Sequence, residues 1–233
     1  MAALVAQLSD PHVNLADGSG DALAAAVEAV LALDPPPDAV LVTGDVADGA
    51  FADEYELAAE LLARLPMPVH AVPGNHDDVA ALRERFDVES FTVGELRVVA
   101  CDTAVPGLVT GRLDTERLDA ELTGDAPAIV AMHHPPFDTG IPALDEIGLP
   151  DDDRRRLAEL LPRRRNALRV ISGHVHRGAF GTVGGRGVLT CPSTHLNAKL
   201  EIGAPEYTIV REPAAFLLHA YVGGELISHV QPV

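Results

Sequence analysis

The sequence predicts an α/β protein whose core consists of two sheets with helices outside them, and three observations support this class. Short apolar segments alternate with helical segments over residues 3–72, which is typical of a largely parallel sheet covered by helices. After residue 90 the strands come in pairs around glycine-containing turns, as in hairpins. No repeat, low-complexity segment or long linker interrupts the chain, so we expect a single domain over residues 1–233.

The first part of the chain alternates strands and helices. Residues 3–9 are mostly apolar and end at a turn, as a buried strand does. Asp21 is placed to cap a helix that runs to about residue 33, where Asp34 and three prolines stop it. The following elements are a strand at 39–43, a helix at 53–65 and a strand at 69–72.

The second part adds hairpins. Its expected elements are a hairpin at 91–100, a helix at 115–122, a strand at 128–132, a helix at 151–161, a strand at 168–171 and hairpins at 178–190 and 215–230. The helix at 151–161 follows Pro150 and has three aspartates in its first turn, where the helix dipole favours negative charge. This change from alternation to hairpins is the reason for expecting two sheets.

The composition excludes several classes of function. Seventeen Lys and Arg against 35 Asp and Glu give a net charge of −18, and 47% of residues are hydrophobic. So acidic a chain does not favour nucleic acid or anionic lipid as a partner, and its apolar content is too high for disorder. The N-terminal segment lacks a basic region, no apolar stretch spans a bilayer, and the two cysteines have no paired spacing. We therefore expect a cytoplasmic protein without a membrane or nucleic-acid partner.

Polar side chains follow five of the predicted strands. The segments are Asp10-Pro11-His12, Gly44-Asp45, Gly74-Asn75-His76-Asp77, His133-His134 and Gly173-His174-Val175-His176. Because ligands gather at the carboxyl ends of strands in α/β sheets, we expect these segments to form one pocket. A glycine precedes Asp45, Asn75 and His174, which lets the backbone approach the site closely.

The residue types in these segments indicate a metal site. Imidazole, carboxylate and carboxamide without thiolate suit Zn, Mn or Fe. One intervening residue puts Asp10 and His12, and likewise His174 and His176, on the same side of an extended segment. Asp45 has two oxygens with which to bridge two ions. Each motif alone is more often a turn or a cap, but five in this order, each after a strand, predict a metal centre.

The complete set of motifs resembles the calcineurin-like metallophosphoesterase superfamily over residues 10–176. Further segments resemble the class III cyclic-nucleotide phosphodiesterases and bacterial glycerophosphodiesterases. These are His133-His134-Pro135-Pro136-Phe137, Gly140-Ile141-Pro142, Gly173-His174-Val175-His176-Arg177 and Pro192-Ser193-Thr194. The resemblance implies a four-layer α-β-β-α sandwich of two mixed sheets flanked by helices.

The resemblance also implies the ligands. Asp10, His12 and His176 would hold one ion, Asn75, His133 and His174 would hold the second, and Asp45 would bridge them. His133 is preferred over its neighbour His134 because the family's ligand is the first residue after the strand. His134 would then support the ligands without binding metal.

The resemblance gives His76 a catalytic role, as a donor to a phosphoryl oxygen or to the leaving group. The alternative for His76 is a supporting contact to a ligand. Asn75 and His176 would contact the substrate together with His76, and Asp77 is expected to orient a neighbour and not to catalyse.

Four other positions carry weaker signals. Arg177 either contacts the substrate or is solvated, and His195 lies either at the pocket rim or in a plain loop. The loop at 135–150 is expected to determine specificity, because it leaves the metal site and has few regular signals. His219 lies in a strand pattern and is expected to be structural.

Together these inferences predict hydrolysis of a small phosphodiester by a hydroxide that bridges two divalent or mixed-valence ions of Mn, Fe or Zn. A 3′,5′-cyclic nucleotide, cyclic AMP, is the leading substrate. The alternatives are a glycerophosphodiester phosphodiesterase, a broader phosphoesterase, and a metal-free scaffold on the same fold. A scaffold would lack one or more ligands, and none is missing. The subgroup resemblance implies a homodimer as well.

Overall fold

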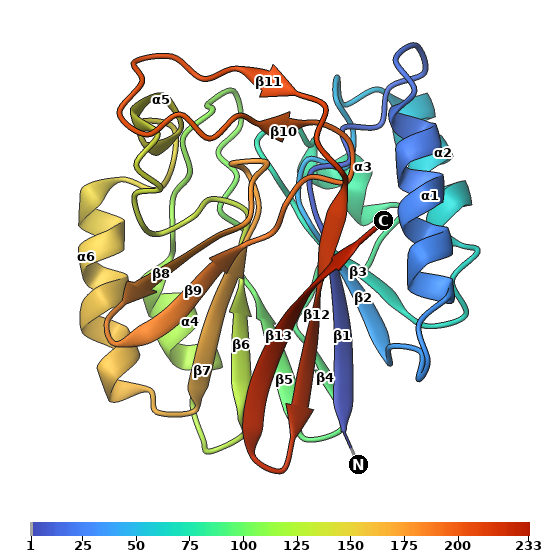
Figure 1. Cartoon of the computed structure of the whole chain (residues 1–233). Coiled ribbons are helices and arrows are strands. Elements are labelled where there is room, and N and C mark those ends of the chain that lie inside the picture. The colour runs from blue at the N-terminus through green and yellow to red at the C-terminus, as the bar shows by residue number, and fades with distance from the viewer. Residues whose placement is uncertain (1) are drawn as a thin grey trace.

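Two mixed β-sheets pack face to face in the computed structural model, which describes residues 2–233, and helices cover both outer sides (Figure 1). One sheet has the strand order β13-β12-β1-β2-β3 and the other the order β4-β5-β6-β7-β9-β8. Each sheet combines parallel with antiparallel neighbours. The expected four-layer α-β-β-α sandwich is therefore confirmed.

The first sheet and its helices come from the two ends of the chain. Their bounds are β1 Ala3–Leu8, α1 Ser19–Leu31, β2 Ala39–Thr43, α2 Ala52–Leu62, β3 Val69–Val72, α3 Val79–Arg83, β12 Ala215–Val222 and β13 Glu225–Pro232. Strands β1, β2 and β3 are parallel, and β12 and β13 add an antiparallel hairpin beside β1. The two ends of the chain therefore meet in one sheet (Figure 1).

The second sheet is formed by the middle of the chain. Its elements are β4 Phe91–Val93, β5 Leu96–Ala100, α4 Thr115–Glu121, β6 Ala128–Ala131, α6 Asp151–Leu160, a 3-10 turn at Leu161–Arg163, β7 Ala167–Ser172, β8 Ala179–Val183 and β9 Arg186–Thr190. Strands β5, β6, β7 and β9 are parallel, and β4 and β8 are antiparallel edge strands.

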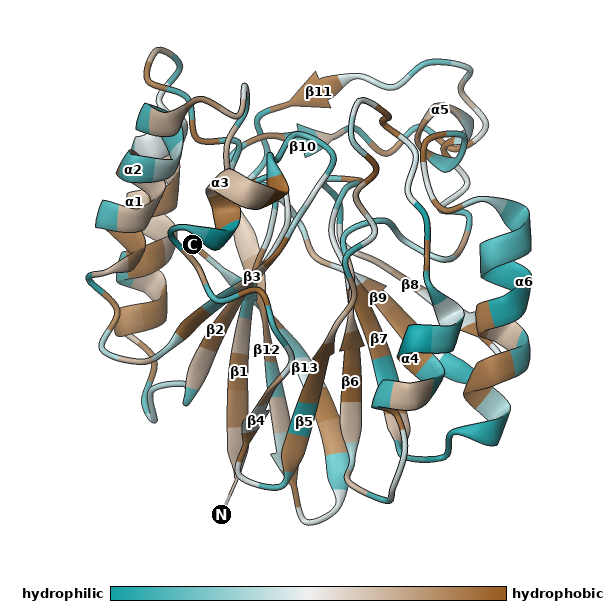
Figure 2. Cartoon of the chain, turned by 180° about the vertical axis from the view of Figure 1, so that it is seen from behind, coloured by the Kyte–Doolittle hydropathy of each residue, from teal (hydrophilic) through white to brown (hydrophobic). Residues whose placement is uncertain are grey.

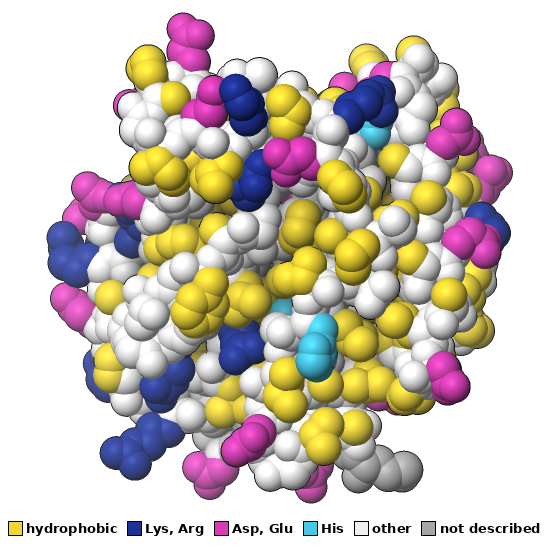
Figure 3. Space-filling model, in the orientation of Figure 1, with side chains coloured by type: hydrophobic (Ala, Val, Ile, Leu, Met, Phe, Trp, Pro, Cys, Tyr) yellow, Lys and Arg dark blue, Asp and Glu magenta, His cyan; other side chains and the backbone are white. Residues whose placement is uncertain are grey.

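Three apolar layers join these four layers of structure, and Figure 2 shows the hydrophobic strands between the more hydrophilic outer helices. Successive strand residues point to opposite faces. Thus β1 sends Ala6 and Leu8 toward the core that contains Leu23 of α1, and Val5 toward the core between the sheets. On the face seen in Figure 3, charged side chains lie mostly around the periphery.

Helix α1 corrects one expectation. It begins at Ser19, and its N-cap residue is Gly18 in the left-handed conformation at φ 82°. The backbone amide of Ser19 donates to Oδ1 of Asp17 at 2.9 Å. Asp21 therefore lies inside the first turn, and naming it as the cap was wrong because Asp17 already binds the free amide.

The parallel strands end at one edge, and small elements lie over it. These are α5 Pro142–Asp145, β10 Asn197–Ala198 and β11 Ile209–Val210, all in the upper part of Figure 1. The helices α3 and α5 were not expected, because four or five residues are too few to show a helical period. Across residues 2–233, every helix is too short or too polar to traverse a lipid bilayer.

Candidate metal centre

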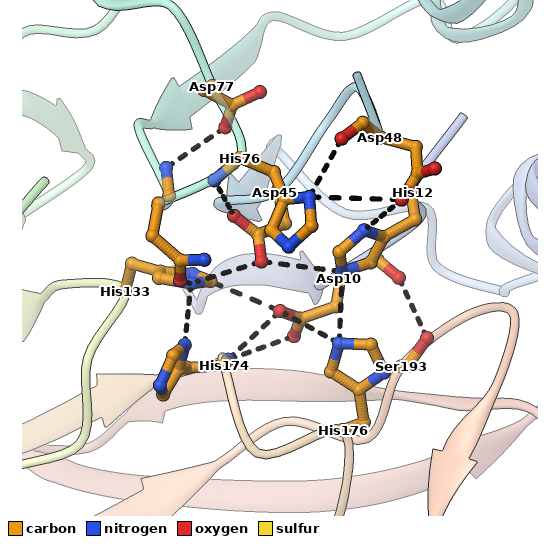
Figure 4. A network of polar contacts seen from close by, with 12 residues as sticks. Asp10, His12, Asp45, Asp48, His76, Asp77, His133, His174, His176 and Ser193 are labelled. Carbon is orange, nitrogen blue, oxygen red and sulfur yellow. Dashed lines mark hydrogen bonds and ion pairs between the residues drawn. The ribbon is translucent and has the colours of Figure 1, made fainter. Parts of the chain in front are cut away.

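The polar loops singled out in the sequence converge at the carboxyl edge of the two sheets (Figure 4). From the first sheet come Asp10 and His12 after β1, Asp45 after β2, and Asn75, His76 and Asp77 after β3. From the second sheet come His133 and His134 after β6, and His174 and His176 after β7. The site therefore lies where the two sheets face each other, and loops of both sheets contribute to it.

Two clusters of ligating atoms lie side by side. One comprises Asp10, His12, Asp45 and His176, the other His133, His134 and His174, and within each the atoms are less than 4.8 Å apart. Asp45 joins the clusters, because its Oδ2 lies 3.3 Å from Nε2 of His12 and 3.4 Å from Nε2 of His133. Oδ1 of Asn75 lies 3.1 Å from Nε2 of His133. The geometry thus offers two adjacent positions for cations with one carboxylate between them.

Four imidazoles turn one nitrogen outward and one inward. The outward nitrogen of each ring has an oxygen partner outside the centre. His12 binds Oδ1 of Asp48 at 3.1 Å, and the other three bind backbone carbonyl oxygens: His133 that of Thr43 (2.8 Å), His174 that of Ile147 (3.0 Å) and His176 that of Leu196 (2.9 Å). Since these partners only accept, each outward nitrogen carries a proton, and each inward nitrogen presents a lone pair whenever its ring is neutral. The inward nitrogens meet in pairs, His12 with His176 at 3.0 Å and His133 with His174 at 3.1 Å. Lone pairs this close repel unless a cation lies between them.

The buried carboxylates of the centre stabilise positive charge on the neighbouring histidines. Burial lowers the pKa of His12, but its hydrogen bonds to Asp45 and Asp48 raise that pKa to about 10. Burial likewise opposes protonation of His133, yet the charge of Asp45 raises the pKa of His133 to about 9. Asp45 resists protonation in turn, because its histidine neighbours hold its pKa well below the usual range despite burial. Without metal, protons on His12 and His133 balance the carboxylate charge, and a divalent ion would displace these protons.

The backbone at the site is strained. Six non-glycine residues within 2–233 have a positive φ, and five of them are predicted ligands. They are Asp10 (49°), His12 (44°), Asp45 (50°), His174 (70°) and His176 (50°). A left-handed non-glycine residue costs about 1–3 kcal/mol and persists where the surroundings enforce it, which is typical of functional sites.

Three glycines let the loops approach the predicted ligands, as the sequence indicated. A Cβ on Gly44 would overlap the ring of His133, and one on Gly74 would overlap the carboxylate of Asp45. A Cβ on Gly173 would come within 2.7 Å of Oδ2 of Asp10. Only glycine therefore fits at the positions before Asp45, Asn75 and His174.

Asp77 holds two loops of the site in register. Its carboxylate accepts hydrogen bonds from the amides of Gly74 (2.9 Å) and Val46 (3.1 Å) and from the hydroxyl of Tyr55 (3.2 Å). Burial, and then the charge of Asp45, raise the pKa of Asp77 to about 6. Asp77 thus fastens the loop that carries Asn75 to the loop that carries Asp45.

The adjacent histidines 133 and 134 point in different directions. His133 faces Asp45 and Asn75, whereas Nδ1 of His134 lies 2.9 Å from the hydroxyl of Thr103 and Nε2 lies 3.2 Å from the carbonyl oxygen of Val109. Burial and the neighbouring His133 lower the pKa of His134 to about 3. His134 is neutral and already has a partner on both ring nitrogens.

Sequence reasoning missed one residue that this geometry brings into the site, Asp48. Its Oδ1 binds Nδ1 of His12, and its carbonyl oxygen accepts a hydrogen bond of 2.7 Å from Nδ1 of His76. His76 is half exposed and stands edge-on to His12 at 4.6 Å between ring centroids. Asp48 follows Asp45 by three residues in the same loop, and that spacing was the available signal.

A cavity of about 260 Å³ opens above the two clusters. His12, Asp45, Asn75, His76, His174 and His176 form its polar floor. Leu144 and Ile147 of the 135–150 loop and Tyr207 and Ile209 near β11 form an apolar wall. His195 also lines the cavity, with Nε2 3.6 Å from Asp17, whereas the guanidinium of Arg177 is bound by Glu212 at 2.8 Å. No Lys or Arg among the described residues lines this cavity.

Comparison with known proteins places this site in a family. The family model described as calcineurin-like phosphoesterase matches residues 3–178, a span that includes all seven predicted ligands. The chain belongs to the calcineurin-like phosphoesterase family. The resemblance inferred from the motifs is therefore confirmed, and the chain is a metal-dependent phosphoesterase by family.

Several relatives of this phosphoesterase carry phosphodiesterase names. It is 29% identical to the 3′,5′-cyclic adenosine monophosphate phosphodiesterase CpdA of Pseudomonas aeruginosa, over 89% of this chain and 81% of that protein. It is 28% identical to the glycerophosphodiester phosphodiesterase GpdQ of Enterobacter lignolyticus, over 97% of this chain and 90% of that protein. A dimetal phosphatase from Danio rerio has the same fold, with a TM-score of 0.72 at 16% identity over 99% of this chain and 96% of that one.

Proposed function

We propose that this phosphoesterase is a dinuclear metal-dependent phosphodiesterase acting on small phosphodiesters, with 3′,5′-cyclic AMP as the first candidate. Asp10, His12 and His176 would hold one ion, Asn75, His133 and His174 would hold the other, and Asp45 would bridge them. When bound, two divalent ions supply Lewis acidity and a nucleophilic water near neutral pH.

One observation carries the proposal, namely the orientation of the four imidazoles. Histidines that bind metal donate their outer N–H to a carbonyl or carboxylate, which fixes the inner nitrogen as the ligand. His12, His133, His174 and His176 all follow this rule, and their inner nitrogens converge around Asp45. His134 does not follow it, which supports His133 as the ligand of the adjacent pair.

His76 and Asn75 are the residues best placed to act on the substrate. Because Nδ1 of His76 donates to the carbonyl oxygen of Asp48, its Nε2 is available to the cavity that His76 lines. There it would donate a hydrogen bond to a phosphoryl oxygen or a proton to the leaving alkoxide. The carboxamide of Asn75 directs Oδ1 toward His133, which leaves its amide nitrogen as a donor to the phosphoryl group.

The charge and shape of the cavity favour a diester over a monoester. A phosphomonoester carries a charge of about −1.5 to −2 at neutral pH, because its second pKa is about 6, whereas a diester carries a single negative charge. The described lining offers Asp17 and Asp48 but no Lys or Arg to neutralise the additional charge. The ring of Tyr207 adds an apolar surface on which a nucleobase would stack.

Two further points of the proposal concern the metal and the alternative substrate. The ligand set suits Mn, Fe or Zn. Similarity to a GpdQ protein over 97% of the chain supports a glycerophosphodiester as the second candidate. Both cysteines, Cys101 and Cys191, are free and buried, which agrees with a reducing compartment such as the cytoplasm.

Hydrolysis by the Mn²⁺-loaded protein tests the proposal with four substrates. They are cyclic AMP, glycerophosphocholine, bis-(4-nitrophenyl) phosphate and 4-nitrophenyl phosphate. We expect the diesters to be cleaved faster than the monoester, and cyclic AMP faster than glycerophosphocholine. Fast monoester cleavage without diester cleavage would contradict a diesterase.

The ligand assignment has its own test in Asn75→Ala, which should lose metal and activity. Asn166→Ala is the matched control, because Asn166 binds the carbonyl oxygens of Leu122 and Ala126 and has no contact with the site. An Asn75→Ala protein with full metal content and full activity would overturn the assignment.

A further inference from the structure

A row of polar side chains crosses the layer between the two sheets, where the other residues are apolar. On β1, Ala3 and Val5 contribute to the apolar core between the sheets, and Gln7 is the next residue on that face. Thr43 follows Leu41 on the same face of β2, and His219 lies opposite Val5 on β12. Gln7, Thr43 and His219 are all fully buried.

At one end this row reaches a predicted metal ligand. The hydroxyl of Ser9 lies 2.5 Å from Oδ2 of Asp10, and the hydroxyl of Thr43 lies 2.7 Å from that of Ser9. Nε2 of Gln7 donates to Oγ1 of Thr43 at 2.9 Å. Both oxygens of Asp10 accept from the backbone amide of His174, at 3.0 and 3.1 Å; Oδ2 carries the additional hydrogen bond from Ser9, and Oδ1 is the oxygen that faces His176 at 3.7 Å.

At the other end the row reaches an arginine. Nε2 of His219 lies 3.0 Å from Oε1 of Gln7, and Nδ1 of His219 lies 2.6 Å from the hydroxyl of Ser228. Arg169, from the second sheet, donates to that hydroxyl from Nη1 at 2.6 Å. Nε of Arg169 has no partner among residues 2–233.

The partners determine the direction of every hydrogen bond in the row. Gln7 also donates to the carbonyl oxygen of Ser172 at 3.0 Å, so the amide nitrogen must be on that side and Oε1 must face His219. Nε2 of His219 therefore carries the proton, and Nδ1 accepts from Ser228. The carboxylate of Asp10 only accepts, so the proton of Ser9 goes to Asp10, and Thr43 is then the donor across its 2.7 Å contact with Ser9. All donors point from the cation of Arg169 toward the carboxylate of Asp10.

Such a row is costly unless every member is paired, because buried polar groups lose their hydration. Apolar residues would fill the same layer, as Val5 and Leu41 do nearby. The Thr43 hydroxyl also lies 3.3 Å from the carbonyl oxygen of Leu8, and the amide of Gln7 holds the Thr43 side chain where its shorter contact, 2.7 Å, goes to Ser9. Without that amide, Thr43 would no longer be held against Ser9, and Ser9 would lose the contact that fixes the position of its hydroxyl beside Asp10.

We propose that Gln7 and His219 are positioning residues for the metal centre, acting through Thr43 and Ser9 to fix Asp10 with Oδ2 bound by Ser9 and Oδ1 turned toward the predicted metal ligand His176. This rests on the proposed function only in taking Asp10 as a metal ligand. It assigns a role in the site to His219, whose strand pattern indicated only a structural residue. Supporting groups behind metal ligands typically change metal affinity by about 10- to 100-fold.

The test measures Mn²⁺ binding to the metal-free protein by chelator competition and electron paramagnetic resonance. His219→Phe and Gln7→Leu should weaken binding of one of the two ions by about tenfold or more. His70→Phe is the matched control. His70 is a buried histidine on β3 of the same sheet, stacked on Phe91 at 3.7 Å, and no hydrogen bond links it to the site. His219→Gln keeps a donor for Gln7 and should restore affinity toward the wild-type value.

Equal Mn²⁺ affinity in folded His219→Phe and His70→Phe would overturn the proposal. If His219→Phe does not fold, Mn²⁺ affinity is compared between Thr43→Val and His70→Phe instead, because Thr43→Val removes the hydroxyl and keeps the side-chain volume. Equal affinity in these two variants would overturn the proposal as well. The outcome is separable from that of the proposed function. Wild-type protein that binds two ions but cleaves no diester refutes the function alone, and unchanged affinity in an active enzyme refutes this inference alone.

Discussion

Gly74→Ala is the sharpest steric perturbation of the predicted bridging carboxylate. The backbone of Gly74 lies outside the left-handed region, so alanine adopts it and only the added Cβ matters. That Cβ would overlap both Oδ1 and the backbone nitrogen of Asp45 and come within 2.8 Å of its Cγ, where ordinary contact begins at 3.4 Å. Asp45 must therefore move by about 1 Å or more relative to Gly74, and a shift of about 1 Å in a catalytic site costs on the order of 100-fold in rate.

We expect Gly74→Ala to lower kcat on bis-(4-nitrophenyl) phosphate by about 10- to 100-fold and to reduce bound metal below two equivalents. Overpacking should destabilise the protein by about 1–3 kcal/mol, which differential scanning calorimetry will show as a lower Tm. Gly178→Ala is the control, since its Cβ would meet nothing closer than Pro192 at 3.4 Å. A Gly74→Ala enzyme with wild-type kcat and two bound ions would refute the placement of Asp45 against this loop.

Three further predictions follow from the same geometry. His133→Ala should lose one metal ion by elemental analysis and His134→Gln should keep both; the reverse result would exchange their roles. His76→Ala should lower kcat on cyclic AMP by about 100-fold but much less on bis-(4-nitrophenyl) phosphate, whose leaving group needs no proton; equal losses would argue against proton donation. Burial, and then Arg169, lower the pKa of His219 from 6.5 to about 3, so its contribution to stability is complete above pH 6.5 and is lost as the pH falls. Metal-free protein should lose about 1–2 kcal/mol of unfolding free energy between pH 6.5 and pH 5 that His219→Phe does not lose, as urea denaturation will show, and parallel pH profiles would contradict this.

The sequence predicted which loops converge better than it predicted the boundaries of the elements. Asp10, Asp45 and His174 each stand two positions after the last residue of a strand, so strand prediction determines where they lie. Helix α1 shows the opposite case. Its start depends on the contact from Asp17 to Ser19, and Asp21 satisfied the same sequence rule equally well.

Residues that act through other residues were not predictable from local pattern. Asp48 acquires its role only because the loop after β2 places it against His12 of the loop after β1. His219 is more than two hundred residues from Gln7 in the chain, and they meet because β12 pairs with β1. Nothing in the sequence near either residue records that pairing.

The central claim is that two bound ions make this chain a phosphodiesterase. The most direct measurement adds Mn²⁺ stepwise to the metal-free protein and follows hydrolysis of bis-(4-nitrophenyl) phosphate after each addition. We predict no hydrolysis without metal and a rate that stops rising at two equivalents per chain. Hydrolysis by the metal-free protein, or a rate that is already maximal at one equivalent, would contradict the claim.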